Sequence, residues 1–281
     1  VAPEFKELTN ALNINDGYKG VLNYLNSLPS KDGFFTKEYS PSGTPSAGCK
    51  PRMYFTKNNA SKIDAIRETV KEWYSQNLIN ETEHSLLLHD LIMAANDIAN
   101  IAGTYGHYLS HFVNRSEDTI HLSPSIFDSD VNIDGHEIRR GYAEELANEL
   151  VADVCYIDPP YIKRQYAANY HILETLARED EPEAIGESGL RPWRDQYSNF
   201  CSKVKIRNSF DLILNNIHCN HIFISYSEDG LLPIEDLLAF LRQYGNVELS
   251  EIRYKRFRSN NSKKGLELTE YLIYLQKNER V

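Results

Sequence analysis

The sequence predicts an α/β fold preceded by a mainly helical region. The character of the chain changes near residue 130, where helical patterns give way to short β-type runs that alternate with helical segments. Such alternation is typical of a mostly parallel, Rossmann-like sheet. The last two β-type runs are joined by a polar loop without a helix, which indicates an antiparallel final strand pair. We therefore expect two regions, a helical and loop region over 1–130 and an α/β region over 131–281.

The first region contains one conspicuous loop and two long helical patterns. The stretch 30–52 is dense in glycine, proline and serine, which predicts a long surface loop. A helix is predicted next, because apolar residues recur every three or four positions from Ile63 to Trp73. A second helical pattern covers 83–102, and Gly103 is expected to end it.

The second region supplies the strands of the predicted sheet. Its β-type runs cover 154–157, 221–226, 247–254 and 269–275. Its helical patterns cover 141–150, 170–178, 209–217 and 234–242. The strand at 154–157 is followed at once by an unusual polar motif, and the carboxyl ends of strands are where open α/β sheets bind ligands.

Composition narrows the class of protein. The chain has 281 residues, of which 41% are hydrophobic, so it can bury a large core and is not a disordered protein. Its 30 basic and 40 acidic residues give a net charge of -10, so any surface for nucleic acid must be local. The four cysteines are too widely spaced for a zinc site or a disulfide framework. With neither a membrane span nor a signal peptide in the sequence, we expect a cytoplasmic protein.

The motif after the first strand, Asp158-Pro159-Pro160-Tyr161, is rich in hydrogen-bond acceptors. Prolines lack an amide N–H, and an ionised aspartate only accepts hydrogen bonds. An exocyclic amine of a nucleobase, which has two N–H donors, matches such a loop. Two acceptors would localise the lone pair of the amine and stabilise the positive charge that develops as nitrogen attacks an electrophile. The alternative is that the motif is only a rigid turn.

Tyr161 adds an aromatic face to the motif. Stacking of a base on such a ring contributes about 1 to 3 kcal/mol. Flipping a base out of the helix costs a few kcal/mol, so stacking can offset much of that cost. The motif therefore predicts a site that receives an extruded base.

Several stretches resemble the adenine-specific DNA methyltransferases of restriction-modification systems. The resemblance is carried by the run 156–161, by Arg164, Gln165 and Tyr166, and by the run 169–177. Shorter stretches that look similar to the same family are 40–43, 52–56, 62–67, 99–106, 189–191, 224–227 and 254–258. The resemblance thus covers nearly the whole chain.

The resemblance implies transfer of a methyl group from S-adenosylmethionine to adenine N6 in double-stranded DNA. Asp158 and the Pro159 carbonyl would hold the amine, Pro160 would fix the loop, and Tyr161 would stack on the base. Asp158 and Tyr161 would also lie beside the cofactor. The family usually carries a glycine-rich cofactor loop after its first strand, and we find no such loop here. The resemblance then implies an incomplete sheet, with the loop lost, located upstream of Val1, or carried by a second polypeptide.

Candidate DNA contacts fall into two groups. Arg164, Gln165, Tyr166 and Asn169 follow the motif and could contact the extruded base, although ordinary surface and capping roles are open for each. The second group is a basic run that contains no acidic residue, which favours a phosphate clamp over an ordinary hairpin tip. Its candidate residues are Lys255, Arg256, Arg258, Lys263 and Lys264. The helical region over 1–130 is where such enzymes read their target sequence.

Two other functions fit the same motif. The loop could present a different planar amine for methylation, such as cytosine N4 or a base of RNA. The chain could also be a DNA-binding or regulatory partner that does not itself hold the cofactor.

Overall fold

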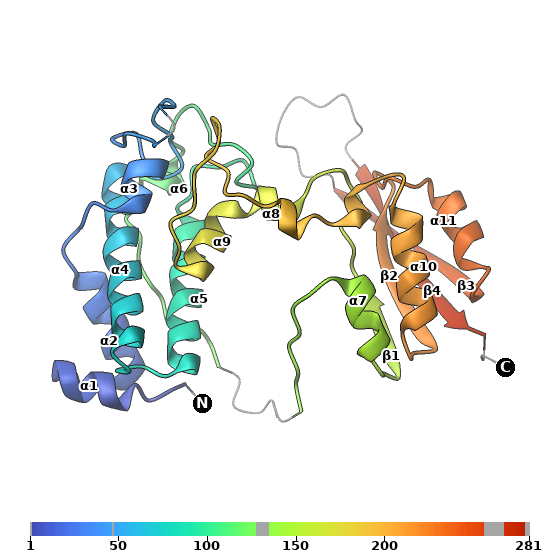
Figure 1. Ribbon diagram of the computed structural model, residues 1–281, viewed down its shortest axis with the longest axis horizontal. Coiled ribbons are helices and arrows are strands. Elements are labelled where there is room, and N and C mark those ends of the chain that lie inside the picture. Colours follow the sequence, from blue (N-terminus) through green and yellow to red (C-terminus); the bar gives the residue numbers. More distant parts are fainter. Residues whose placement is uncertain (1, 47, 128–134, 256–266, 279–281) are drawn as a thin grey trace. The chain divides into compact units, whose positions relative to one another are not determined.

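The computed structural model describes residues 2–46, 48–127, 135–255 and 267–278. The chain divides into two compact units (Figure 1). Unit 1 comprises Val1–Gly135 and Ala167–Asp195, and unit 2 comprises His136–Tyr166 and Gln196–Val281. The chain thus changes character close to the predicted position, but residues 167–195 pack with the helical unit rather than with the region that follows residue 130.

Unit 1 is built from helices. They are α1 (Lys6–Leu12), α2 (Gly17–Ser27), α3 (Phe34–Tyr39), α4 (Lys57–Ser75), α5 (Glu81–Asp97), α6 (Asn114–Glu117) and α9 (His171–Arg178). The long patterns predicted from Ile63 and over 83–102 correspond to α4 and α5. Helix α5 begins with a capping box between Asn80 and Glu83. It ends at Asp97, earlier than Gly103.

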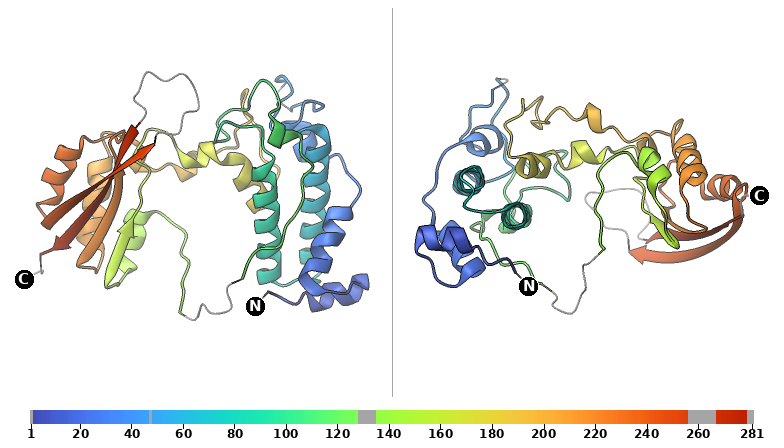
Figure 2. Two further views of the ribbon diagram at one scale, coloured as in Figure 1. Left: turned by 180° about the vertical axis from the view of Figure 1, so that it is seen from behind. Right: turned by 60° about the horizontal axis from the view of Figure 1, so that its bottom comes forward.

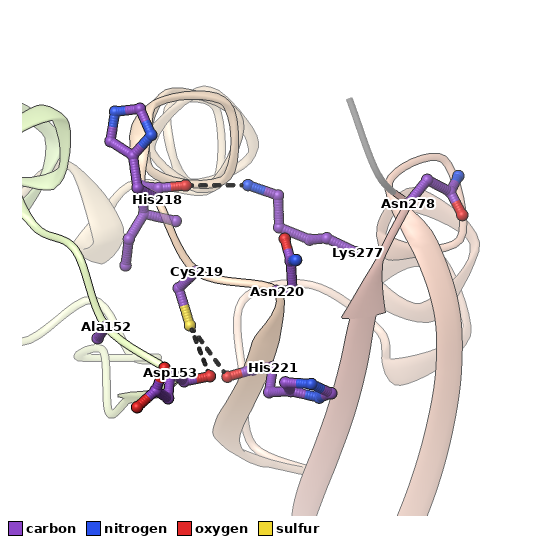
Figure 3. Close-up of a pocket in the computed structure, with 9 residues that line it drawn as sticks. Ala152, Asp153, His218, Cys219, Asn220, His221, Lys277 and Asn278 are labelled. Atoms are coloured by element: carbon purple, nitrogen blue, oxygen red, sulfur yellow. Dashed lines mark hydrogen bonds between the residues drawn. The ribbon is translucent and has the colours of Figure 1, made fainter. Parts of the chain in front are cut away.

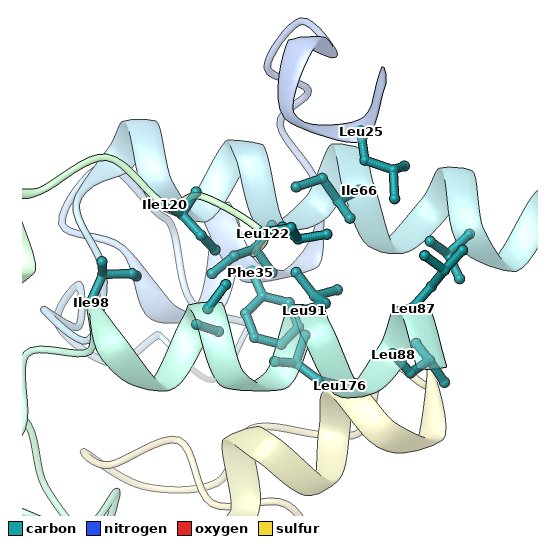
Figure 4. Close-up of a cluster of buried hydrophobic side chains, with 14 of the residues drawn as sticks. Leu25, Phe35, Ile66, Leu87, Leu88, Leu91, Ile98, Ile120, Leu122 and Leu176 are labelled. Carbon is teal, nitrogen blue, oxygen red and sulfur yellow. The ribbon is translucent and has the colours of Figure 1, made fainter. Parts of the chain in front are cut away.

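The core of unit 1 lies between α4, α5 and α9. Figure 4 shows Phe35 surrounded by Leu91, Leu122 and Leu176, and the four residues come from four different segments. Leu176 belongs to α9, so the later segment of unit 1 completes the core of the earlier one. Burial of these apolar side chains is the main stabilising contribution in such a core.

Helix α3 lies inside the stretch that the sequence predicts to be a surface loop. Its first turn is capped from a distance, because the carboxylate of Asp64 on α4 accepts hydrogen bonds from the backbone N–H groups of Gly33, Phe35 and Thr36 at 2.8 to 2.9 Å. The ring of Phe35 is fully buried. The local composition could not reveal this helix, because its cap is about 30 residues away in the sequence.

Unit 2 contains the sheet. Its strands are β1 (Val154–Ile157), β2 (His221–Ser227), β3 (Gly245–Lys255) and β4 (Glu267–Lys277), in the order β1-β2-β4-β3. Its helical elements are α7 (Ala143–Leu146), η1 (Ala147–Glu149), η3 (Asn199–Cys201), α10 (Ile206–Asn216) and α11 (Ile234–Leu241). Two short elements, α8 (Tyr166–Asn169) and η2 (Arg194–Gln196), lie where the chain passes between the units.

The sheet is mixed. The β1–β2 pair is parallel, whereas β4 pairs antiparallel with both β2 and β3. The predicted antiparallel final pair is confirmed, but the expectation of a mostly parallel sheet is wrong for the described strands. The reason is that β4 inserts between β2 and β3, so it contributes two antiparallel pairings. The arrangement is consistent with a methyltransferase fold.

Helices cover one face of this sheet. Apolar residues of α10 and α11, including Phe210 and Leu237, pack against Ile222, Ile224 and Ile273 of the strands. Figures 1 and 2 show both helices on the same side of the strands. Within the described residues, no helix is long and apolar enough to span a membrane. All four cysteines are described, and none forms a disulfide.

Candidate methylation site

The candidate site begins at Asp158, which directly follows β1 as predicted. Ile157 pairs with Ile224 in the parallel register, so Asp158 lies beside Ser225 at the carboxyl ends of two neighbouring strands. The Ser225 hydroxyl donates a hydrogen bond to Asp158 Oδ1 at 2.9 Å. Asp158 is exposed whereas Pro159 is buried, so the motif presents its carboxylate to solvent while its first proline anchors the turn.

Tyr161 is held by the loop that follows β2. Its ring meets that of Tyr226 edge to face, with centroids 5.9 Å apart, and its carbonyl accepts a hydrogen bond from the Leu231 N–H at 2.9 Å. Tyr226 is buried and its hydroxyl bonds to both backbone groups of Leu232. A Cβ added at Gly230 would lie 2.4 Å from the Tyr226 ring, so only glycine fits there. Tyr226 is therefore a packing residue that supports Tyr161.

The surroundings of the motif are acidic. Burial raises the pKa of Glu270, and the neighbouring carboxylates of Asp158, Asp229 and Glu228 raise it further, against the opposing effect of a hydrogen bond with Ser227. Burial also raises the pKa of the Tyr161 hydroxyl, with Glu270 adding to the effect. No local pattern in the sequence points to Glu270, because it reaches this edge only through the pairing of β4 with β2. Negative potential here favours a positively charged guest.

The residues after the motif have different surroundings. Arg164 and Tyr166 are exposed. Gln165 is buried, and its amide forms two hydrogen bonds with the backbone of Ser198, at 3.0 Å and 2.8 Å. Asn169 lies in unit 1, where its carbonyl accepts a hydrogen bond from the Tyr105 N–H at 2.7 Å. Of the four predicted residues, Arg164 and Tyr166 are thus exposed, Gln165 has a structural side chain, and Asn169 bonds within unit 1 through its backbone carbonyl.

Most of the basic run lies outside the described residues. Lys255 is the last residue of β3 and pairs in register with Glu267. Arg256, Arg258, Lys263 and Lys264 fall within 256–266, which the structure does not describe. Their role as a phosphate clamp stays a prediction.

Other stretches that resemble the methyltransferase family form a buried polar network in unit 1. Arg52 is completely buried, with its Nη1 2.9 Å from Glu38 Oε2, and it donates further hydrogen bonds to the carbonyls of Ala184, Gly186 and Glu187. A Cβ added at Gly189 would lie 2.7 Å from the Arg52 Nε. These family-like residues therefore stabilise the helical unit. They belong to other stretches of the sequence than the acceptor loop.

His171 belongs to the same network. Burial lowers its pKa to about 4, and its Nε2–H donates to the Tyr105 carbonyl at 3.0 Å. The ring is fully buried and neutral at pH 7. His171 is therefore a structural hydrogen-bonding residue of unit 1.

S-adenosylmethionine would need a cradle for its methionine end as well as acceptors near its methyl group. Asp158 and Tyr161 fit the second requirement by position. The first is not met within the described residues, because no glycine there with a positive φ follows a strand. Gly103 has a φ of 126°, but it follows α5 in the helical unit.

Unit 2 also contains a cavity of about 770 Å³, shown in Figure 3. It lies at the amino ends of β1 and β2, next to Asp153 and Cys219, so it is at the opposite end of these strands from Asp158. The Cys219 thiol contacts the carbonyls of Asp153 and His221 at 3.6 Å and 3.3 Å. The cavity is separate from the acceptor loop.

Comparisons with known proteins agree with the chemistry of this loop. The family model described as D12 class N6 adenine-specific DNA methyltransferase matches residues 5–239. The chain is 39% identical over 285 residues to Type II methyltransferase M.FokI of Planomicrobium okeanokoites, and the match covers 98% of this chain and 42% of that protein. It is 34% identical over 282 residues to Modification methylase StsI of Streptococcus sanguinis, with 98% and 41% covered.

A shorter relative is matched over most of its length. The chain is 31% identical over 262 residues to Type II methyltransferase M.NlaIII of Neisseria lactamica, covering 92% of this chain and 75% of that protein. The chain spans about two fifths of the length of the M.FokI and StsI enzymes. No solved structure matches the chain significantly.

Proposed function

The chain belongs to the D12 class N6 adenine-specific DNA methyltransferase family, and we propose that it transfers a methyl group from S-adenosylmethionine to adenine N6 in DNA. We propose further that it is the modification enzyme of a restriction-modification system, or a subunit of it, and that it acts in the cytoplasm. The observation that carries this proposal is the exposed Asp158 carboxylate on a proline-fixed turn at the carboxyl end of β1.

The chemistry follows from the acceptors of the loop. Asp158 and the Pro159 carbonyl accept the two N–H bonds of the adenine amine, which directs the nitrogen lone pair away from the ring system. S-adenosylmethionine, when bound, supplies an electrophilic methyl group on a sulfonium. As the N–C bond formed, the S–CH3 bond would break and the donor would leave as a neutral thioether. The positive charge would pass to the amine, where the acidic surroundings of Asp158 would stabilise it. The methylated nitrogen then releases a proton, for which no strong base is required.

Tyr161 and the residues after it would hold the DNA. Tyr161 stacks on the extruded adenine, supported from behind by Tyr226. Arg164 and Tyr166 contact the DNA beside the extruded base, with Asn169 at the end of the same segment. Gln165 supports this surface, because its two hydrogen bonds with the Ser198 backbone hold the segment in place. Lys255 and the basic residues after it, Arg256, Arg258, Lys263 and Lys264, bind phosphates.

The helical unit would read the target sequence. The proposal assigns this role to the predicted region 1–130 together with residues 167–195, because both stretches form one compact unit. The rigid network around Arg52 supports it, since recognition surfaces are more precise when the elements that carry them are held in place.

A second polypeptide segment would supply the cofactor loop. β1 is an edge strand of the described sheet, and its Val154 and Tyr156 are 57% and 61% exposed. Tyr156 shares a cross-strand row with Phe223 and Tyr274, whose rings stack with centroids 5.0 Å apart. Parallel strands are normally buried on both faces. A strand carrying the glycine-rich loop could pair with β1 along its outer edge, and the segment that follows this strand could pack over the row.

The test is methyl transfer from tritiated S-adenosylmethionine to DNA, followed by digestion to nucleosides. Label in N6-methyldeoxyadenosine supports the proposal, whereas label in N4-methylcytosine or only in RNA would assign the chain to a different amine. Binding of S-adenosylmethionine is measured separately by calorimetry. DNA binding without cofactor binding or transfer, even when the segment that carries the cofactor loop is added, would support the partner-protein alternative instead.

A further inference from the structure

Two features at the carboxyl ends of β1 and β2 bear on how the acceptor carboxylate is oriented. Asp158 is exposed, and the final torsion of an aspartate side chain has a broad energy profile, so solvent alone would leave its oxygens in many orientations. The Ser225 hydroxyl donates to Oδ1 at 2.9 Å. The other oxygen, Oδ2, is then directed away from Ser225 and can accept the amine.

Both ends of this hydrogen bond are rigid. Ser225 lies inside β2, between the parallel pairing of Ile224 with Ile157 and its own antiparallel pairing with Leu272. On the other side, the backbone after Asp158 is fixed by the ring of Pro159, which is buried. Formation of the Ser225–Asp158 hydrogen bond therefore costs little conformational entropy. The bond depends on the register of the two strands rather than on a flexible loop.

We propose that Ser225 is a positioning residue for methyl transfer, which fixes the Asp158 carboxylate so that Oδ2 faces the amine of the substrate. The inference rests on the proposed function of Asp158 and deepens it. Ser225 does not touch the substrate. Its removal leaves the acceptor in place but allows it to turn, so it should lower the rate of the chemical step and leave DNA binding unchanged.

The experiment compares three variants of the full chain. Ser225→Ala removes the hydroxyl, Ser225→Thr keeps it on a side chain suited to a strand, and Ser250→Ala is the matched control. Ser250 pairs with Leu272 on the far side of β4, so it occupies the same cross-strand row as Ser225, two strands away. Each variant is measured for single-turnover methyl transfer, DNA affinity and the orientation of Asp158 in a high-resolution crystal structure.

We expect Ser225→Ala to lower the single-turnover rate about tenfold and to change DNA affinity less than about twofold. Ser225→Thr should retain the rate to within about threefold, and Ser250→Ala should match the wild type. Asp158 should show one carboxylate orientation in the wild type and several in Ser225→Ala. An identical single orientation in both, or an equal loss in Ser250→Ala, overturns the inference. Absence of methyl transfer by the wild type, even when the segment that carries the cofactor loop is added, would overturn the proposed function instead, and the crystal structures would still decide whether Ser225 orients the carboxylate.

Discussion

The guanidinium of Arg52 and the carboxylate of Glu38 form an ion pair, 2.9 Å apart, that is completely withdrawn from solvent. Burial alone would raise the pKa of Glu38, but hydrogen bonds from Ser46 and the charge of Arg52 lower it below its usual value. Arg52 also satisfies the carbonyls of the loop that contains Gly186. One side chain thus joins α3 to a segment more than 130 residues away.

Removal of this guanidinium should destabilise the helical unit strongly. Arg52→Met leaves the Glu38 charge and several carbonyls buried without their partner, so we expect the free energy of unfolding to fall by about 3 to 5 kcal/mol. Arg52→Lys should lose most of that amount too, because one ammonium cannot reproduce the planar fork. Urea unfolding measures both. The control is Arg178→Met, which breaks a partly exposed pair with Glu174 and should cost at most about 1 kcal/mol. Equal losses would contradict a special role for the buried pair.

Replacement of Asp158 should abolish turnover without unfolding the protein. The carboxylate is exposed, so Asp158→Ala removes little packing. We expect methyl transfer to fall at least about 100-fold, because the developing charge on the amine loses its main acceptor. Asp158→Asn, which keeps one carbonyl oxygen, should lie between the wild type and Asp158→Ala. Circular dichroism provides the folding control, and normal turnover of Asp158→Ala would refute the assigned role.

Stability should fall on mild acidification because of His171. Burial places its pKa at about 4 in the folded protein, below the usual 6.5. The unfolded chain therefore binds a proton between these values and the folded protein does not, so stability falls as the pH drops through 6.5. The loss from this group between pH 7 and pH 5 is about 2 kcal/mol. Urea titrations at the two pH values measure it, and His171→Gln should show a smaller difference.

The neighbours Arg164 and Gln165 should give opposite phenotypes. Arg164→Ala changes an exposed side chain, so we expect weaker DNA binding with unchanged stability. Gln165→Glu places a carboxylate oxygen against the carbonyl of Ser198, so it should lower the free energy of unfolding by about 1 to 3 kcal/mol. Fluorescence anisotropy with labelled DNA and thermal unfolding separate the two effects. Loss of stability in Arg164→Ala would argue against its role at the surface.

The basic run should act through DNA phosphates. Replacement of Arg256 and Arg258 by alanine should weaken DNA binding and reduce the slope of log affinity against log salt by about 1 for each phosphate that is no longer neutralised. Arg207→Ala is a control for the loss of an arginine elsewhere on the surface, because Arg207 is exposed and pairs with Asp236 on the helical side of unit 2. An unchanged slope in the double variant would identify the run as an ordinary hairpin tip.

Local patterns predicted the strands well and the long-range relationships poorly. β1 is found at the predicted residues, and β2 extends only one residue further, because runs of β-branched and aromatic residues between polar breaks are local signals. The order of the strands was not predictable in this way, since the insertion of β4 between β2 and β3 depends on pairing between distant segments. The same reason hides Glu270, which reaches the acceptor loop only across the sheet.

The roles of side chains were likewise predictable where they depend on a local motif and unpredictable where they depend on a distant partner. The exposed Asp158 follows from a motif that is contiguous in the sequence. The structural use of Gln165 does not, because its partner Ser198 lies 33 residues further on. Likewise, α3 depends on the distant carboxylate of Asp64, so a composition typical of a loop conceals a buried helix.

The helical unit is assembled from two separate stretches of sequence, with the acceptor loop encoded between them. A gene fragment that stops at Gly135 omits Leu176, which completes the core around Phe35. Neither unit is therefore encoded by one uninterrupted stretch of the gene. If the helical unit reads the target sequence, as proposed, an exchange of target preference between two such proteins by recombination would have to transplant residues 1–135 and 167–195 together, while leaving the intervening stretch with its original sheet.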